Sequence, residues 1–240
     1  MFNNIEIITV SKVGSANFKY ACEKHYNKVF HTHSLLHLKN VLNKKTNTLI
    51  ISGIRNPLDR NISYFFQSFG YNKYNTLKMK SNNYKGEYMY IKDLNLQPIF
   101  LNNFQTIQNN TEQLIQYYFK YMKHYTFNDW FKEFFKLTKI EKLPFNKELG
   151  YTIYDLPNNN KLLLYKLENL NNNKLNICQY IGIDDLININ DNNNRYYKNN
   201  YKEFKNKIKF TNDYKNQLLN TKYMKYFYTD DEIKMFYNKY

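Results

Sequence analysis

Residues 48–63 read TLIISGIRNPLDRNIS, and they carry the strongest fold signal in the chain. The segment Thr48–Ile54 is apolar and rich in β-branched side chains, which is typical of a strand buried on both faces. Pro57 then suits the first turn of a helix, which we expect to run through NISYFFQSF towards Gly70. A buried strand that leads directly into a helix is the unit from which parallel α/β sheets are built.

Similar alternation extends to both sides of this unit. Ile5–Val10 and Lys28–His33 are predicted to be strands, separated by the small-residue turn SKVGSAN and a helix over Phe18–Asn27. A further strand is predicted at Lys161–Tyr165. The fold class that follows is α/β, with a P-loop-like, doubly wound parallel sheet flanked by helices and a mostly helical C-terminal third.

The rest of the chain carries weaker signals. A polar helix or turn is expected before Thr48, and Tyr71–Ile107 is interpreted as a loop excursion or lid. Runs of three asparagines are interpreted as surface loops. Helices are predicted over Thr111–Lys123, Phe127–Lys139 and most of Tyr197–Tyr240, with Lys222–Tyr240 as a docking helix. Without an internal repeat or a convincing linker, residues 1–240 are predicted to form a single domain.

The composition is strongly basic, with a formal net charge of +15. Part of this charge reflects a bias towards Asn, Lys, Tyr and Ile that is typical of AT-rich coding sequence. Of the 35 basic residues only Arg55, Arg60 and Arg195 are arginine. Because arginine offers a rigid donor fork that lysine cannot reproduce, each retained arginine is expected to have a geometric task.

The cellular location is predicted from the absence of recognisable targeting and membrane segments in the sequence. No stretch approaches the roughly 18 consecutive apolar residues that a membrane span needs, and no signal peptide is recognised at the N-terminus. The two cysteines, Cys22 and Cys178, cannot form a disulfide framework and fit a reducing compartment. We therefore expect a cytoplasmic protein.

The first chemical motif is SKVGSAN, Ser11–Asn17, between a predicted strand and a predicted helix. Small residues there allow backbone N–H groups to close around an anion at the helix N-terminus, and Lys12 adds a point charge. The motif is not a Walker A loop, because G-x-x-x-x-G-K-[ST] is absent. The alternative is an ordinary turn from strand to helix.

The second motif is RNPLDRNIS, which begins at Arg55 and ends at Ser63. Arg55 leaves the carboxyl end of the strongest strand, where open α/β sheets bind ligands. Ser63 follows eight residues later, about two helical turns on. An arginine and a hydroxyl at this spacing can share one phosphate; alternatively, Arg55 is a surface ion-pair residue.

Together the two motifs resemble those of the sulfotransferases that use 3′-phosphoadenosine 5′-phosphosulfate (PAPS). In that family a strand leads into P-K-x-G/A-[ST]-[ST] and a helix, and a second strand ends in Arg, with Pro soon after and Ser eight residues beyond. In this sequence Arg55, Pro57 and Ser63 match the second pattern. In the first pattern, Ser11 replaces the proline that usually precedes the lysine. The resemblance implies that Arg55 and Ser63 bind the 3′-phosphate. It also implies that the 5′-phosphosulfate is bound by Lys12, Val13, Gly14, Ser15, Ala16 and Asn17, with Ala16 replacing a second hydroxyl.

The third motif is His31-Thr32-His33, whose two imidazoles share one face if the segment is a strand. It resembles the H-x-H of the uronyl 2-O-sulfotransferases, and the order of all three motifs resembles bacterial proteins of capsular polysaccharide synthesis. The resemblance implies that a histidine, His33 ahead of His31, deprotonates an acceptor hydroxyl on a carbohydrate. One alternative is a half-buried strand whose histidines are solvated. Another is metal binding through His31, His33 and His37, but no Cys or carboxylate cluster completes a site, so no metal is predicted.

Two later segments extend the resemblance. Glu168, in YKLENL, lies in a segment that is similar to the Y-E-D-L of the family, and it is either an orienting partner of Lys12 or a histidine, or an exposed acid. A late basic loop in the family closes over the 3′-phosphate, which implies such a role for Arg195 or Lys198.

The expected activity is therefore transfer of a sulfonate group from PAPS to a hydroxyl, by in-line displacement without a metal. A glycan is the expected acceptor, with a tyrosyl peptide or a small molecule as alternatives. One alternative is a degenerate P-loop nucleotide kinase or NTPase. Another is a basic nucleic-acid-binding protein, which the charge and the interleaved Lys and Tyr suggest. Nucleic acid is the less favoured partner because it leaves the spacing of Arg55 and Ser63 unexplained. A pseudoenzyme that keeps the fold is a third alternative, because of Ala16.

Overall fold

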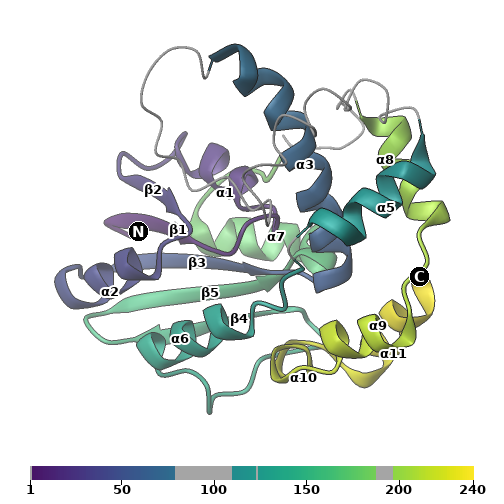
Figure 1. Ribbon diagram of the computed structural model, residues 1–240. Coiled ribbons are helices and arrows are strands. Elements are labelled where there is room, and N and C mark those ends of the chain that lie inside the picture. Colours follow the sequence, from purple (N-terminus) through teal and green to yellow (C-terminus); the bar gives the residue numbers. More distant parts are fainter. Residues whose placement is uncertain (1, 79–109, 123, 188–196) are drawn as a thin grey trace.

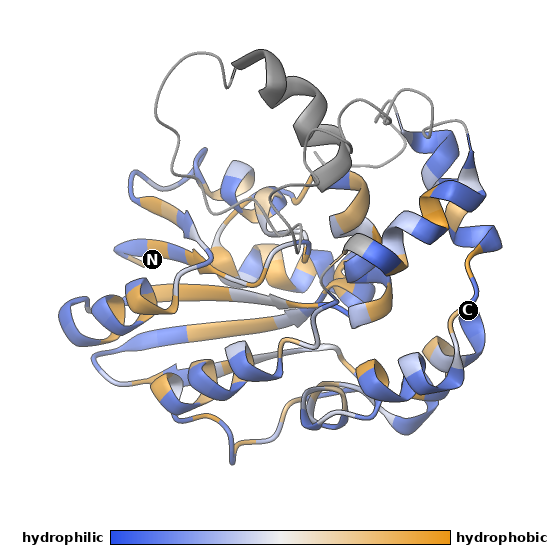
Figure 2. Ribbon diagram, in the orientation of Figure 1, coloured by the Kyte–Doolittle hydropathy of each residue, from blue (hydrophilic) through white to orange (hydrophobic). Residues whose placement is uncertain are grey.

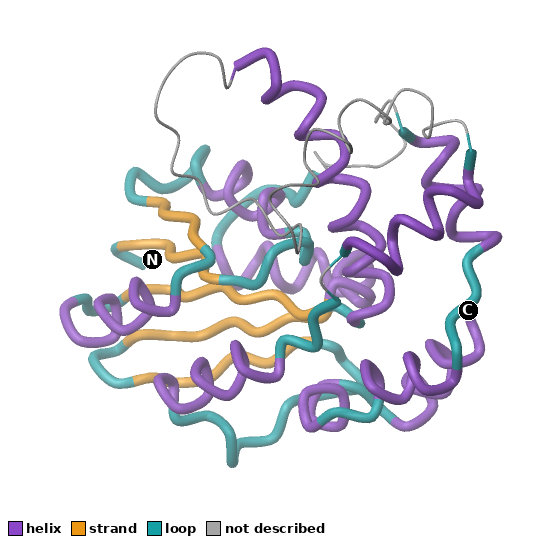
Figure 3. The backbone as a smooth tube through the Cα atoms, viewed as in Figure 1, coloured by secondary structure: helices purple, strands orange, loops and turns teal. Residues whose placement is uncertain are grey.

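The computed structural model describes residues 2–78, 110–122, 124–187 and 197–240. Its centre is a five-stranded sheet with helices on both faces (Figures 1 and 3). The strand order is β2-β1-β3-β5-β4, parallel throughout except for β4, which runs antiparallel to β5. The strands are β1 (Asn4–Ile8), β2 (Val29–Thr32), β3 (Thr48–Ile54), β4 (Tyr151–Leu156) and β5 (Asn160–Lys166). The predicted α/β class, with its mainly parallel sheet, is confirmed.

The inner strands are hydrophobic on both faces because each face is covered by helices. All seven residues of β3 are buried. Ile51 of β3 belongs to one core cluster and its neighbour Ile50 to the other, as expected from the period of two along a strand. Figure 2 shows the resulting pattern, with apolar strands inside and mixed, amphipathic helices outside.

The helices beside the sheet divide between its two faces. One core cluster joins the sheet to α1 (Ser15–Cys22) and α7 (Leu170–Ile181). The other joins it to α2 (Leu35–Lys44) and α6 (Asn128–Thr138). Strand β1 pairs in parallel with β2 on one side and with β3 on the other, so the strand order changes direction between β1 and β3. The carboxyl ends of these two parallel strands lie side by side at that point.

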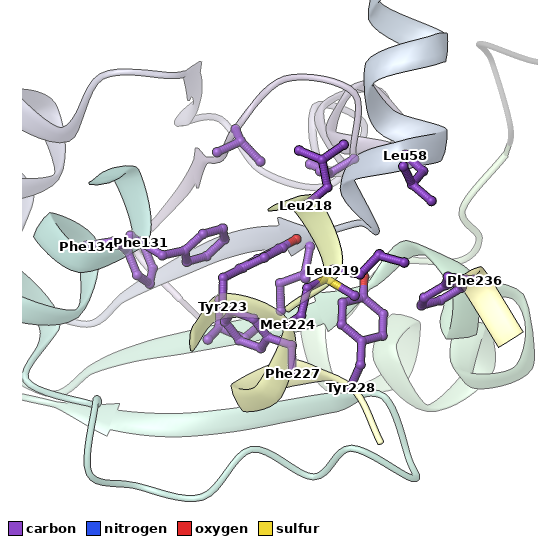
Figure 4. Packing of buried hydrophobic residues seen from close by; sticks show 14 of the residues in the cluster. Leu58, Phe131, Phe134, Leu218, Leu219, Tyr223, Met224, Phe227, Tyr228 and Phe236 are labelled. Carbon is purple, nitrogen blue, oxygen red and sulfur yellow. The ribbon is translucent and has the colours of Figure 1, made fainter. Parts of the chain in front are cut away.

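The remaining helices pack beyond the carboxyl edge of the sheet and around α6. Figure 4 shows aromatic side chains of the C-terminal helices against Phe131 and Phe134 of α6, and the ring of Phe131 stacks on that of Tyr223 at 4.7 Å. These elements are α3 (Pro57–Lys78), α5 (Thr111–Tyr121), a 3-10 turn η2 (Leu167–Asn169), α8 (Lys198–Lys207), α9 (Asn212–Leu219), α10 (Lys222–Phe227) and α11 (Asp230–Lys239).

Several predicted elements need correction. Helix α3 continues past Gly70 to Lys78, so the first residues of the predicted loop at 71–107 are helical, and residues 79–107 lie outside the described part. Strand β4 was not predicted, and α1 ends at Cys22 rather than Asn27. The predicted docking helix is two helices, since Thr229 forms a capping box with Glu232 and starts α11 afresh.

Within the four described ranges, no helix combines the length and the apolar character that crossing a bilayer requires.

Candidate functional site

The loop after β1 has an unusual backbone. Lys12 has a φ of 72° and Gly14 a φ of 78°, both in the left-handed region. A Cβ on Gly14 would lie 2.8 Å from the side chain of Leu167, so glycine is required there on both counts. Lys12 carries a side chain, so its left-handed backbone is strained. A strained residue of this kind keeps its conformation only when its surroundings hold it in place.

Three side chains supply that hold, because the carbonyls of residues 11–13 each accept a hydrogen bond. The bonds run from Arg60 Nε to Ser11 O (3.2 Å), from Arg55 Nη1 to Lys12 O (3.2 Å) and from Tyr165 Oη to Val13 O (2.8 Å). In a trans peptide the next N–H points opposite to the carbonyl. The amides of residues 12–14 are therefore directed away from these donors, and α1 begins immediately afterwards without an acidic residue in its first turn.

Gly53 of β3 has no side chain, and this leaves room for the ring of Tyr165 to contact the loop. A Cβ at this position would lie 2.6 Å from Tyr165 Oη and 2.7 Å from the side chain of Val13. Such distances are shorter than any van der Waals contact, so a larger residue would displace the ring, the loop or both.

Arg55 follows β3 directly and lies at the predicted edge of the sheet. Tyr223 of α10 fixes its backbone, because Tyr223 Oη accepts from Arg55 N (3.3 Å) and donates to Arg55 O (2.6 Å). The guanidinium of Arg55 donates to the Lys12 carbonyl, and its charge partly offsets the burial that raises the pKa of Tyr201 on α8. The structure thus brings the two sequence motifs into direct contact.

The other predicted binding residues lie on the two helices that begin here. Ser15, Ala16 and Asn17 form the first turn of α1, where Asn17 N donates to Gly14 O at 3.1 Å. Ser63 lies on the second turn of α3 and is buried. Lys198 is exposed at the start of α8, whereas Arg195 lies outside the described residues.

His31 and His33 meet at the carboxyl end of β2, with ring centroids 5.4 Å apart in an edge-on contact. His31 Nε2 lies 2.9 Å from Ser15 Oγ, which ties the histidine motif to the loop. Burial lowers the pKa of His31 to about 4, with smaller contributions from His33 and Lys19. His31 is therefore neutral at neutral pH.

The tautomer of His33 follows from its hydrogen bond. Its Nδ1 lies 2.6 Å from the carbonyl oxygen of Thr9. Because a carbonyl only accepts, Nδ1 carries the proton and, in the neutral ring, the lone pair is on Nε2.

His37 has a different setting from the other two histidines. Its Nε2 pairs with the buried Glu6 at 2.8 Å, and Lys45 pairs with the same carboxylate. Across the described ranges, no group of three His, Cys, Asp or Glu side chains is arranged to hold a metal ion.

Glu168 connects the ends of β3 and β5 to the C-terminal segment. Its carboxylate accepts from Asn56 N (2.8 Å), from Asn56 Nδ2 (2.9 Å) and from Tyr228 Oη (3.2 Å). Glu168 as a whole residue is exposed, but its carboxyl group is buried. This burial raises the pKa of the carboxyl. These contacts give Glu168 a structural role beside Arg55.

Asp59, in the first turn of α3, is the anchor of the C-terminal helices. It pairs with Lys205 at 2.8 Å and Lys239 at 2.7 Å, and it accepts from Tyr240 Oη at 2.6 Å. Burial raises the pKa of this carboxyl, but the lysines and Arg55 outweigh burial and hold it well below its ordinary value.

The contacts of Arg60, Tyr165 and Tyr223 with the loop and with Arg55 were not predicted, although Arg60 was expected to have a geometric task. The rarity of arginine was a signal for Arg60. Tyr165 begins the YKLENL segment, but nothing in the sequence marks it or Tyr223 for these contacts, since they depend on which strand and helix face the loop.

No family model matches the chain, and comparisons with curated proteins and with solved structures find no match. The arrangement of the residues themselves therefore carries the functional argument.

Proposed function

We propose that this protein is a sulfotransferase that transfers a sulfonate group from PAPS to a hydroxyl of a carbohydrate. The observation that supports this most directly is the hydrogen bond from Arg55 to the Lys12 carbonyl. It joins two motifs that are 43 residues apart, at the point between β1 and β3 where doubly wound sheets bind ligands. A loop that leads from the first strand into a helix N-terminus is also where P-loop-like folds place phosphate groups.

The residues at this edge fit an anionic nucleotide. The amides of residues 12–14 point away from the side chains that hold their carbonyls, and the helix dipole of α1 favours negative charge. Lys12 adds positive charge in the loop itself, and Arg55 and Arg60 add it where they contact the carbonyls of Lys12 and Ser11. One carboxylate there, Asp59, is already paired with two lysines.

In the proposed reaction the acceptor oxygen forms a bond to sulfur while the bridging sulfur–oxygen bond breaks, and 3′,5′-adenosine bisphosphate leaves with the electron pair. Lys12 and the loop amides stabilise the charge that develops on the bridging oxygen. Arg55 and Ser63 hold the 3′-phosphate and so set the distance between donor and acceptor. The proton of the acceptor hydroxyl passes to a histidine.

His33 is the better base of the pair. Its tautomer places the lone pair on Nε2, the atom opposite the Thr9 contact. The lowered pKa of His31 makes that ring a weak base, and its Nε2 is engaged with Ser15. His31 instead orients the Ser15 hydroxyl towards the loop.

The test is calorimetric titration with 3′,5′-adenosine bisphosphate in the presence of EDTA, with 5′-AMP as the control nucleotide. We expect micromolar binding that requires the 3′-phosphate and weakens at least tenfold in Arg55→Ala. Lys12→Ala should bind less tightly and lose turnover. Equal binding of both nucleotides would remove the proposal, and magnesium-dependent binding of ATP would replace it with a nucleotide kinase or NTPase.

A further inference from the structure

Arg60 lies in the first turn of α3 and is 3% exposed. Its Nε donates to Ser11 O at 3.2 Å and its Nη2 to Ser11 Oγ at 2.5 Å. Its Nη1 donates to Asn61 Oδ1 at 3.1 Å. Two of the three bonds therefore converge on one residue, the first of the anion-binding loop Ser11–Asn17.

The setting of the Arg60 charge is unusual. All three of these acceptors are neutral, and the guanidinium carbon lies over the rings of Phe127 (4.1 Å), Tyr64 (4.7 Å) and Tyr125 (5.6 Å). Burial lowers the pKa of the group, yet a guanidinium stays charged at neutral pH. A buried cation is costly unless it is well bonded, and contact with aromatic faces offsets only part of that cost.

The shape of arginine explains why this cost is retained. Its planar group donates two bonds to Ser11 from one edge while its faces contact aromatic rings. A lysine is a single point charge and cannot do both. In a chain where 32 of 35 basic residues are lysine, the arginine at position 60 marks a geometric requirement.

We propose that Arg60 is a positioning residue for the anion-binding loop and that the Ser11 hydroxyl is its specific partner. By fixing both oxygens of Ser11, Arg60 orients the peptide between residues 11 and 12 and stabilises the left-handed backbone of Lys12. Its effect on the loop follows from the contacts alone. Its effect on nucleotide affinity rests on the proposed function.

The first test measures hydrogen exchange of the amides of residues 12–16 in the full chain. We expect about tenfold faster exchange in Arg60→Lys and in Ser11→Ala. Ser52→Ala is the matched control, because it removes a hydroxyl in β3 that is buried and makes no hydrogen bond among the described residues. Unchanged exchange in Ser11→Ala overturns the proposal even if Arg60→Lys fails to fold.

The second test measures the dissociation constant for 3′,5′-adenosine bisphosphate. Each single variant should raise it about tenfold, and the double variant should raise it no further than Arg60→Lys alone, because Arg60→Lys already removes the bond to the Ser11 hydroxyl. A hundredfold rise in the double variant would mean independent roles and would sink the pairing. If the wild-type chain does not bind the nucleotide but exchange rises as expected, the proposed function fails and the positioning role of Arg60 stands.

Discussion

His31 and His33 are two residues apart, yet their partners give them different chemistry. The Thr9 carbonyl determines which nitrogen of His33 carries the proton, and Ser15 engages Nε2 of His31. Burial keeps His31 neutral. One ring is thus suited to accept a proton and the other to orient a hydroxyl.

We expect His33→Ala to lower the turnover number by about 10²–10⁴, the usual contribution of a general base, with unchanged affinity for 3′,5′-adenosine bisphosphate. His31→Ala should instead weaken that affinity, because it releases Ser15. Steady-state kinetics with calorimetry on both variants separates the two effects. The reverse result, with turnover lost only in His31→Ala, would exchange the two roles.

His31 also makes stability depend on pH. Its pKa is lowered from 6.5 in the unfolded chain to about 4 in the folded one, first through burial and then through His33 and Lys19, with Glu23 opposing. Between these two pKa values the unfolded chain binds more protons than the folded one. The contribution of neutral His31 to the stability of the fold is therefore fully present above pH 6.5 and is lost as pH falls towards 4. In urea titrations, the free energy of unfolding should fall less between pH 7 and pH 5 in His31→Gln than in the wild-type chain. An identical loss would mean that other groups dominate this window.

At the scale of elements, Asp59 joins three helices that are far apart in the chain. The residue lies in α3, and its partners Lys205, Lys239 and Tyr240 lie in α8 and at the end of α11. One of the same helices, α8, supplies Tyr201, which interacts electrostatically with Arg55. The position of Arg55 is therefore coupled to how firmly the C-terminal helices are attached.

Asp59→Asn should lower the free energy of unfolding by about 2 kcal/mol, which is less than for a fully buried pair because both lysines remain partly exposed. The lowered pKa means that the carboxylate stabilises the fold above its unfolded pKa and loses this effect as pH falls, so the variant should also show less acid sensitivity. Asp155→Asn, at an ion pair with an 85% exposed aspartate, is the matched control and should cost less than about 0.5 kcal/mol. Equal costs in urea titrations of the two variants would contradict the anchoring role.

The elements that sequence predicted well are those whose signal is local. Strand β3 was predicted because a short segment rich in Ile and Leu, with only small or neutral residues between them, suits a strand buried on both faces. Strand β4 was not predicted. It forms a hairpin with β5, and the turn between them contains Asn158 and Asn159, whose φ values of 62° and 56° are those of a tight hairpin turn. That asparagine run was interpreted only as a surface loop, yet its third member, Asn160, is buried and bonds Thr48 N.

The candidate site divides in the same way. The positions of the Ser11–Asn17 loop and of Arg55 at the carboxyl ends of two neighbouring strands could be predicted, because both follow segments with a strong local strand signal. The contacts of Tyr165 and Arg60 with the loop depend on strand order and on the packing of α3, which no local pattern encodes. Helix α3 also passes through Gly70, since one glycine costs a helix only about 1 kcal/mol.

For the whole molecule, the net charge of +15 produces a positive field that attracts any polyanion, whatever the site binds. Surface attraction and specific nucleotide binding differ in their response to salt. DNA that contacts six to ten lysines would lose about 10³–10⁵ in affinity between 50 and 200 mM salt, because counterions are released at every phosphate. We expect 3′,5′-adenosine bisphosphate, held by a few groups around Lys12 and Arg55, to lose less than about tenfold over the same range.

Competition then separates the proposed site from the basic surface. Saturating 3′,5′-adenosine bisphosphate should leave DNA binding unchanged in a fluorescence anisotropy titration, since DNA contacts lysines spread over the surface. Arg55→Ala should likewise weaken nucleotide binding without altering DNA binding. If the nucleotide displaces DNA, and both affinities fall with the same steep dependence on salt, then the anion-binding loop is part of a nucleic-acid interface and the basic surface is the functional feature of this protein.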